Sequence, residues 1–86
     1  MTKREKSWSL KEIDTAREQP KGTAFLAFKQ LKHSFDEGRD FFYLGADQDG
    51  HEIEKLRTSG RVYATTVNAI LLSESGHAAI IDYLDG

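Results

Sequence analysis

The stretch that most constrains the fold is residues 60–84, GRVYATTVNAILLSESGHAAIIDYL, which holds most of the strongly apolar sequence in the second half of the chain. Its first part, residues 62–72, is rich in β-branched and aromatic side chains and contains no Pro or Gly, which favours a strand. Its second part, residues 77–84, places apolar side chains three apart, which favours a helix with one buried face. Between them, Ser73 or Ser75 can cap that helix. The stretch therefore predicts an extended segment, a tight polar corner and a closing helix.

A second local signal marks the start of the first helix. Ser9 and Glu12 have the S-x-x-E spacing of a capping box, and Trp8 and Ile13 lie at the positions of a hydrophobic staple. These side chains predict a helix over residues 10–18 that ends before the next proline. Trp8 either docks this helix on the core or belongs to a partner-binding surface, and both interpretations stay open.

Apolar patterns and turn residues outline the rest of the fold. The remaining elements are expected to be a helix over 24–35, a strand over 39–44, a loop over 45–50 and a short helix over 52–58 that ends at Gly60. The expected core consists of large apolar side chains: Phe25, Phe28, Leu31, Phe41, Leu56, Val67, Ile70, Leu72 and Ile81. We therefore predict an α+β fold, a single domain over residues 9–86 that follows a flexible basic arm at residues 1–8. Its small antiparallel sheet is formed by residues 39–44 and 62–72 and covered by three to four short helices.

Composition narrows the class of protein. The chain has 86 residues, enough for one domain, and no Cys, which excludes a disulfide framework and a thiolate metal site. No apolar run is long enough to span a bilayer, and the charged start is not followed by the apolar segment of a signal peptide. We therefore expect a cytoplasmic protein with no membrane association and no cofactor.

Charge is distributed unevenly along the chain. Residues 1–32 carry eight Lys/Arg and four Asp/Glu, a net of +4, and residues 33–86 carry four and ten, a net of −6, which together give the formal net charge of −2. A basic half can bind an anionic partner with one face. The same pattern also describes a solvated surface with uneven charge.

No motif of catalytic or metal-binding chemistry is recognisable. The three histidines have no metal-ligand spacing, and the D-x-D-G fragment at Asp47 lacks the other ligands of a calcium loop. Ser75 near His77 suggests a nucleophile and a base, which is the hydrolase hypothesis, but no nucleophile motif surrounds them. We therefore expect that the protein is not an enzyme and binds no metal.

The order of four segments resembles the N-terminal DNA-binding domains of phage antirepressor-type regulators, the KilA-N-like group. The segments are AFKQLKHSF, EGRDFFYL, EIEKLRTSGRVY and LLSESGHAAIIDYL. The matching residues lie within positions 23–84: Phe28, Leu31, Gly38, Asp40, Phe41, Leu56, Leu72, Ser73, Glu74, Gly76, Ile80 and Leu84. This resemblance implies a G-x-D-F strand, a turn that starts a closing helix, and a DNA-binding regulator of a prophage or mobile element.

Residues 60–71, GRVYATTVNAIL, are similar to the turn and second helix of ribbon–helix–helix antitoxins. This second resemblance implies helices at 52–59 and 65–72, and a homodimer whose paired strands enter the major groove. Both resemblances imply double-stranded DNA as the partner.

The DNA-binding hypothesis assigns two kinds of side chain. The cations expected to contact phosphates are Lys29, Lys32, Arg57 and Arg61. The polar side chains expected to read base edges are Thr65, Thr66 and Asn68. The alternative hypothesis is a protein-binding module or inhibitor that binds no nucleic acid and uses the acidic half of the chain.

Overall fold

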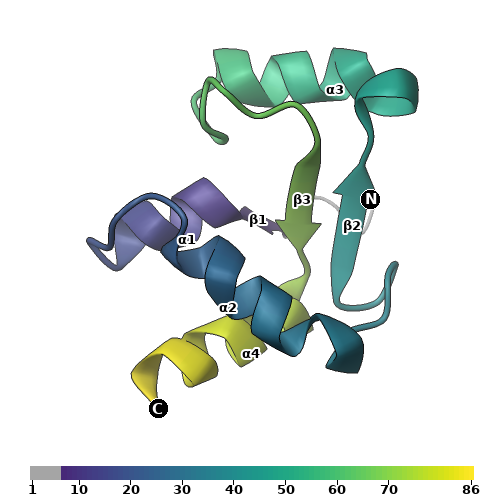
Figure 1. Cartoon of the computed structure of the whole chain (residues 1–86). Helices are drawn as coiled ribbons and strands as arrows, with labels where there is room; N and C mark the ends of the chain where they lie inside the picture. The colour runs from purple at the N-terminus through teal and green to yellow at the C-terminus, as the bar shows by residue number, and fades with distance from the viewer. Residues whose placement is uncertain (1–6) are drawn as a thin grey trace.

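The computed structural model of the chain describes residues 7–86. Its elements, in chain order, are β1 (Trp8–Ser9), α1 (Leu10–Ala16), α2 (Thr23–Leu31), the 3-10 helix η2 (Lys32–Ser34), β2 (Phe41–Leu44), α3 (Ala46–Thr58), β3 (Ala69–Leu72) and α4 (Glu74–Asp85) (Figure 1). The predicted α+β class is confirmed, with one small antiparallel sheet and short helices in a single domain. Most of the expected basic arm lies outside the described residues, but its last residue, Trp8, is part of β1.

The sheet has the strand order β1-β3-β2, and both strand pairings are antiparallel. Successive side chains of a strand point to opposite faces. The pairs Phe41–Leu72 and Tyr43–Ile70 therefore share one face, and the pairs Phe42–Leu71 and Leu44–Ala69 share the other. Both faces are apolar, so each must be covered.

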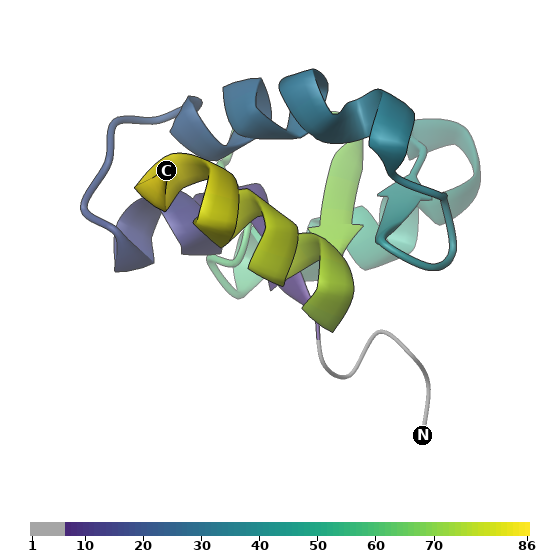
Figure 2. The ribbon, with the colours of Figure 1, turned by 90° about the horizontal axis from the view of Figure 1, so that it is seen from below.

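Two clusters of buried side chains cover these faces. The first joins the Phe41–Leu72 end of the sheet to α1, α2 and α4 and consists of Ile13, Ala24, Ala27, Phe28, Phe41, Leu72 and Ile80. The second joins the opposite face to α3 and consists of Leu44, Ile53, Leu56, Val62, Ala69 and Leu71. Figures 1 and 2 show α2 and α4 crossing together at one end of β2 and β3, with α3 at the other end. Each fully buried Leu or Ile contributes roughly 1.5–3 kcal/mol through removal from water.

The extended segment predicted over residues 62–72 is a strand only from Ala69 onward. Val62 is buried against α3, and the Tyr63 hydroxyl donates to Asp14 Oδ2 at 2.6 Å, so this part of the segment is anchored away from the sheet. Val67, predicted to lie in the core, is therefore 64% exposed. The helix at 65–72 that the ribbon–helix–helix resemblance implies is also absent, because β3 occupies its second half.

The second helix buries only some of the large apolar side chains that were expected in the core. Its buried residues are Ala24, Ala27 and Phe28, and Phe25, predicted to be a core residue, is 43% exposed. Alanines let neighbouring helices approach closely, so they take the inner positions and turn Phe25 to the edge. Of the other predicted core residues, Phe28, Phe41, Leu56 and Leu72 are buried, and Leu31, Ile70 and Ile81 are half-buried.

The third helix begins at Ala46, inside the segment predicted to be a loop. Two side chains accept hydrogen bonds from the backbone at its start: Asn68 Oδ1 from the Ala46 amide at 2.9 Å, and Asp49 Oδ2 from the Gly45 amide at 3.1 Å. The first turn is separated from the rest by non-helical φ/ψ at Asp49. The predicted end is confirmed, since Gly60 follows the helix with a left-handed φ of 79°.

The predicted capping box of α1 is present. Ser9 Oγ accepts from the Glu12 amide at 3.1 Å, and Glu12 Oε1 accepts from the Ser9 amide at 2.8 Å. The Ser9 hydroxyl also donates to the Arg61 carbonyl oxygen. Trp8 is half-buried and stacks on His77 with ring centroids 4.1 Å apart, so it docks β1 on α4. This position supports the first of its two interpretations.

Replacing Ser9 by alanine is expected to lower the free energy of unfolding by about 2 kcal/mol, because the change removes the helix cap and leaves the partly buried Arg61 carbonyl without its donor. Urea denaturation followed by circular dichroism measures the effect. Ser34→Ala, at an exposed position of η2, is the control and should change little. Equal stability of Ser9→Ala and the parent chain would mean that α1 is not docked.

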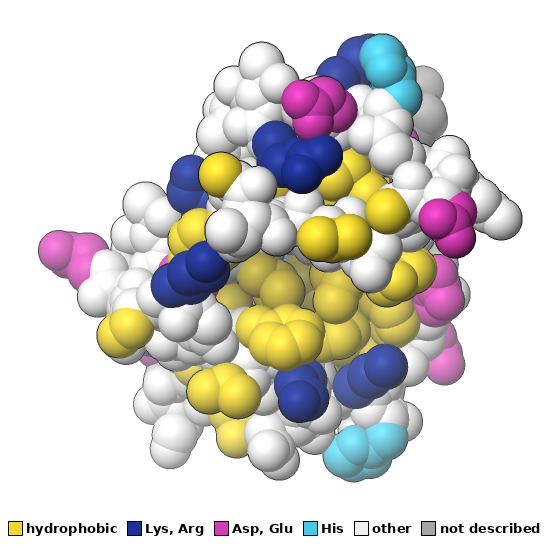
Figure 3. Space-filling view, turned by 45° about the horizontal axis from the view of Figure 1, so that its top comes forward, with side chains coloured by type: hydrophobic (Ala, Val, Ile, Leu, Met, Phe, Trp, Pro, Cys, Tyr) yellow, Lys and Arg dark blue, Asp and Glu magenta, His cyan; other side chains and the backbone are white. Residues whose placement is uncertain are grey.

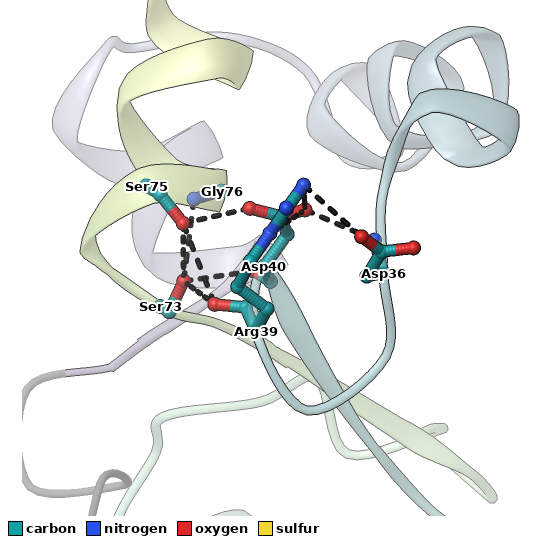
Figure 4. A network of polar contacts seen from close by, with 6 residues as sticks. All are labelled: Asp36, Arg39, Asp40, Ser73, Ser75 and Gly76. Atoms are coloured by element: carbon teal, nitrogen blue, oxygen red, sulfur yellow. Dashed lines mark hydrogen bonds and ion pairs between the residues drawn. The ribbon is translucent and has the colours of Figure 1, made fainter.

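A polar junction joins the start of β2 to the start of α4, and it connects two of the motifs singled out in the sequence (Figure 4). The Asp40 carbonyl oxygen accepts from the Ser73 amide at 3.0 Å, and the Asp40 carboxylate accepts from Ser75 Oγ at 2.7 Å. Ser73 is the N-cap of α4 and accepts from the Gly76 amide. Hydrogen bonds from Arg39, then from the Asp36 amide, lower the pKa of Asp40 to about 2.

Candidate nucleic-acid interface

Two adjoining hollows form a groove between α2, the open part of the sheet and the segment before β3. Their volumes are about 230 and 440 Å³, and both are lined by Phe25, Asn68 and Ile70. Figure 3 shows apolar side chains on the floor of a hollowed face and Lys or Arg side chains around it. We call this surface the lysine groove, and its main lining residues are Lys11, Lys21, Phe25, Lys29, Lys32, Tyr43, Thr66, Asn68 and Ile70.

The groove exists because the helices cover only one end of the sheet face. The Phe41–Leu72 pair is buried beneath α2 and α4, whereas on the same face Ile70 is only half-buried against this cluster and Tyr43 is not part of it. Tyr43 is consequently 48% exposed. Together with Phe25 on α2, it places an exposed aromatic ring on each side of the hollow that these residues share. Exposed aromatic rings that line a hollow are typical of binding surfaces.

The cations of residues 7–86 divide sharply between ion-paired arginines and lysines without a carboxylate partner. All four arginines are paired: Arg17 with Asp85, Arg39 with Asp36 and Asp40, Arg57 with Glu54, and Arg61 with Glu12. The five lysines of the same range form no ion pair with a described carboxylate, and four of them line the groove. Lys55, on α3, is the exception. The groove therefore gathers positive charge that the fold itself does not neutralise.

Three of the groove lysines are positioned by neighbouring aromatic rings. Lys29 Nζ lies 5.6 Å from the centre of the Phe25 ring, and Lys21 Nζ lies 5.0 Å from that of Tyr63. Lys11 Nζ approaches the same tyrosine ring at 5.8 Å. Such cation–π contacts stabilise an exposed lysine by about 0.5–1 kcal/mol while leaving its ammonium group accessible.

Asp14 is the only carboxylate among the described residues that line the two hollows. It is buried, and its oxygens accept from the Gly22 amide at 3.1 Å, the Ala24 amide at 2.8 Å and the Tyr63 hydroxyl at 2.6 Å. Burial, together with the Asp14 hydrogen bond, raises the pKa of Tyr63 to about 12, so this hydroxyl remains a donor at neutral pH. Asp14 therefore accepts hydrogen bonds at the start of α2 and forms no ion pair with the groove lysines.

The structure brings together four of the predicted site residues: Lys29, Lys32, Thr66 and Asn68 all line the groove. Thr65 lies beside it and accepts from Lys21 Nζ at 3.0 Å. The Arg61 guanidinium donates hydrogen bonds within the fold, to Glu12 Oε1 and to the Ser7 carbonyl oxygen.

Arg57 is likewise engaged, with Glu54 and the Thr66 carbonyl oxygen. Reasoning from sequence missed Lys11, Lys21 and the aromatic pair Phe25 and Tyr43 as site residues. The net positive charge of residues 1–32 is the sequence feature that points to these two lysines. No local sequence pattern indicates which aromatic rings stay exposed.

The residues considered for catalysis are arranged for other contacts. Ser75 Oγ donates to Asp40, and His77 stacks on Trp8, where burial lowers the pKa of His77. Within residues 7–86, no three His, Asp or Glu side chains are grouped as metal ligands. No helix in the same range is both long and apolar enough to cross a bilayer.

Comparison with known proteins does not place the chain in a family: no family model matches it, and no curated protein or solved structure is significantly similar. The KilA-N-like and ribbon–helix–helix resemblances therefore remain predictions from short motifs.

Proposed function

We propose that this protein is a small DNA-binding regulator that contacts phosphates through the lysine groove. The observation that carries the proposal is the gathering of four lysines around the two adjoining hollows, none of them ion-paired within residues 7–86: Lys11, Lys21, Lys29 and Lys32. Phosphate contacts by Lys dominate the affinity of proteins for nucleic acid. A net charge of −2 does not oppose this, because local potential rather than total charge guides an anionic partner.

The biological setting of the proposal comes from the resemblance to phage antirepressor-type regulators. Under this proposal the protein regulates a prophage or mobile element and acts in the cytoplasm, as the composition of the chain led us to expect. The phosphate contacts are reassigned from the sequence-based set: Lys11 and Lys21 replace Arg57 and Arg61, whose guanidinium groups are ion-paired. Thr66 and Asn68 stay as candidate base-reading side chains at the groove.

Replacing Lys29 and Lys32 together by alanine is expected to weaken binding to all DNA sequences nearly alike. Phosphate contacts carry no sequence information, so discrimination between sequences should survive. The slope of log K against log salt should become shallower by about 0.7–0.9 for each phosphate that is no longer neutralised. Fluorescence anisotropy titrations over a series of salt concentrations measure both quantities.

The control is Lys55→Ala, which removes a lysine from α3, away from the groove. It should leave the affinity and the salt slope unchanged. If the double variant and the Lys55 variant behave alike, the groove lysines are ordinary solvated side chains and the proposal is wrong.

A protein-binding module is the second candidate function. It is favoured by an acidic hollow beside the lysine groove, lined by Glu37, which precedes β2, and by Asp47 and Asp49 in the first turn of α3. This surface and the lysine groove are lined by different charged residues, so each can be tested alone. Charge reversal of Asp47 should abolish partner binding under this hypothesis and leave DNA binding intact.

A further inference from the structure

The shape and lining of the lysine groove specify more than attraction to phosphate. Phe25 from α2 and Tyr43 from β2 are 43% and 48% exposed and line the same hollow, with Ile70 on its floor. Lys29 and Lys32 line this hollow too, and Lys11 and Lys21 line the adjoining one. Apolar surface at the centre and cations at the edge suit a ligand whose flat apolar groups alternate with anions.

We infer that the lysine groove binds single-stranded DNA, with unpaired bases packed on Phe25 and Tyr43 and the backbone phosphates near the four lysines. The inference rests on the proposed function and deepens it, because it names the form of the DNA. Aromatic side chains in a positively charged groove are the usual means of binding single strands, since every base has a face that can stack.

A duplex fits these features less well. Its bases are stacked inside the helix, so contact along the backbone would leave Phe25 and Tyr43 exposed to water. The lysines would gain phosphate contacts, but the aromatic pair and Ile70 would contribute nothing. A single strand covers both kinds of surface at once.

Two other anionic ligands, an acidic peptide and an RNA strand, can be compared with single-stranded DNA by the charge and the lining of the groove. An acidic peptide would satisfy the lysines, but its side chains do not supply the flat rings that two exposed aromatic groups accommodate. An RNA strand carries the same kinds of stacking base and phosphate, so RNA is one of the probes in the test. The choice of DNA follows from the proposed function.

The test compares four probes in anisotropy titrations at low salt: oligothymidylate of about 12 nucleotides, the matching duplex, oligouridylate and polyglutamate. The single DNA strand is expected to bind about tenfold tighter than the duplex. The double variant Phe25→Ala and Tyr43→Ala should lose about tenfold or more of this affinity with an unchanged salt slope, because stacking releases no counterions. Tyr43→Phe keeps the ring and should bind like the parent chain.

A matched control removes two apolar side chains outside the groove, Leu26 and Tyr83, which are 63% and 47% exposed. The variant Leu26→Ala and Tyr83→Ala should bind the single strand as the parent chain does. Circular dichroism of every variant checks the fold. A loss of affinity in this control equal to that of the groove variant would overturn the assignment of the aromatic pair.

Other outcomes separate this inference from the function on which it rests. Equal or tighter binding of the duplex, insensitive to Phe25 and Tyr43, overturns the single-strand inference and keeps DNA binding. Binding of neither DNA form at low salt overturns both. Tighter binding of oligouridylate or of polyglutamate than of oligothymidylate overturns the choice of DNA as the occupant.

Discussion

Gly76→Ala is expected to unfold the protein or to lower its free energy of unfolding by more than about 4 kcal/mol. Gly76 lies in the first turn of α4, and a Cβ there would be 3.0 Å from the Asp40 carbonyl carbon and would overlap its oxygen. The Leu72 side chain, 3.2 Å from the same point, blocks movement in another direction. The clash involves backbone on one side and the core on the other, so neither partner can shift cheaply.

Thermal and urea denaturation of the purified variant measure this effect, with the soluble yield as a first indicator. Gly50→Ala is the matched control, because Gly50 is in α3 and its added Cβ would meet open space. That change should stabilise the helix by up to about 1 kcal/mol. A Gly76 variant as stable as the parent chain would show that α4 does not pack on β2 as described.

Asp40→Ala is expected to lower the free energy of unfolding by about 3 kcal/mol at neutral pH. The buried carboxylate accepts from the Asp36 amide at 2.9 Å, from Ser75 Oγ at 2.7 Å and from the Arg39 guanidinium. Removing it breaks these hydrogen bonds and weakens the link between the loop before β2 and the start of α4. Asp82→Ala, on the exposed side of α4, is the control and should have little effect.

The pH dependence gives the Asp40 prediction a second measurement. Because the folded state lowers the pKa of Asp40 from 3.8 to about 2, the unfolded chain binds the proton more readily in this range. The carboxylate therefore stabilises the fold fully above about pH 5 and loses roughly 2 kcal/mol of that effect as the pH falls to about 2. The difference between parent and variant should shrink over this interval. A constant difference would mean that the ionised form is not the stabilising one.

Several features of the fold follow from short-range sequence alone. The predicted capping box of Ser9 and Glu12 and the predicted end of α3 at Gly60 are present, and of the two predicted caps of α4, Ser73 or Ser75, the structure uses Ser73. Each depends on bonds or dihedral angles within about one helical turn, so neighbouring residues suffice to specify it. The run FFYL forms a strand within the predicted range, but only Phe41 and Leu44 are buried, while Phe42 is half-buried and Tyr43 is exposed.

The candidate site was predicted only in part, because its members come from separate elements. The positions of Lys29 and Lys32 on the predicted helix over residues 24–35 are enough to predict that both are exposed cations. From the sequence, Arg57 and Arg61 are equally good candidates for phosphate contacts. In the structure, Glu54 pairs with Arg57 and Glu12 pairs with Arg61. Glu12 is far from Arg61 along the chain, so no local pattern reveals that ion pair.

What the sequence by itself determined is the α+β class and the helix ends that local caps define at Ser9 and Gly60. Tertiary contacts set the starts of α3 and β3, which differ from the predicted ones. Tertiary packing alone decided which apolar side chains remain exposed and which cations remain unpaired. Ala24 and Ala27 admit the neighbouring helices and turn Phe25 outward, and the helices stop short of Tyr43 on the sheet. The groove is the space left over by that packing. Its position depends on contacts between residues distant in the chain, which periodicity and spacing do not encode.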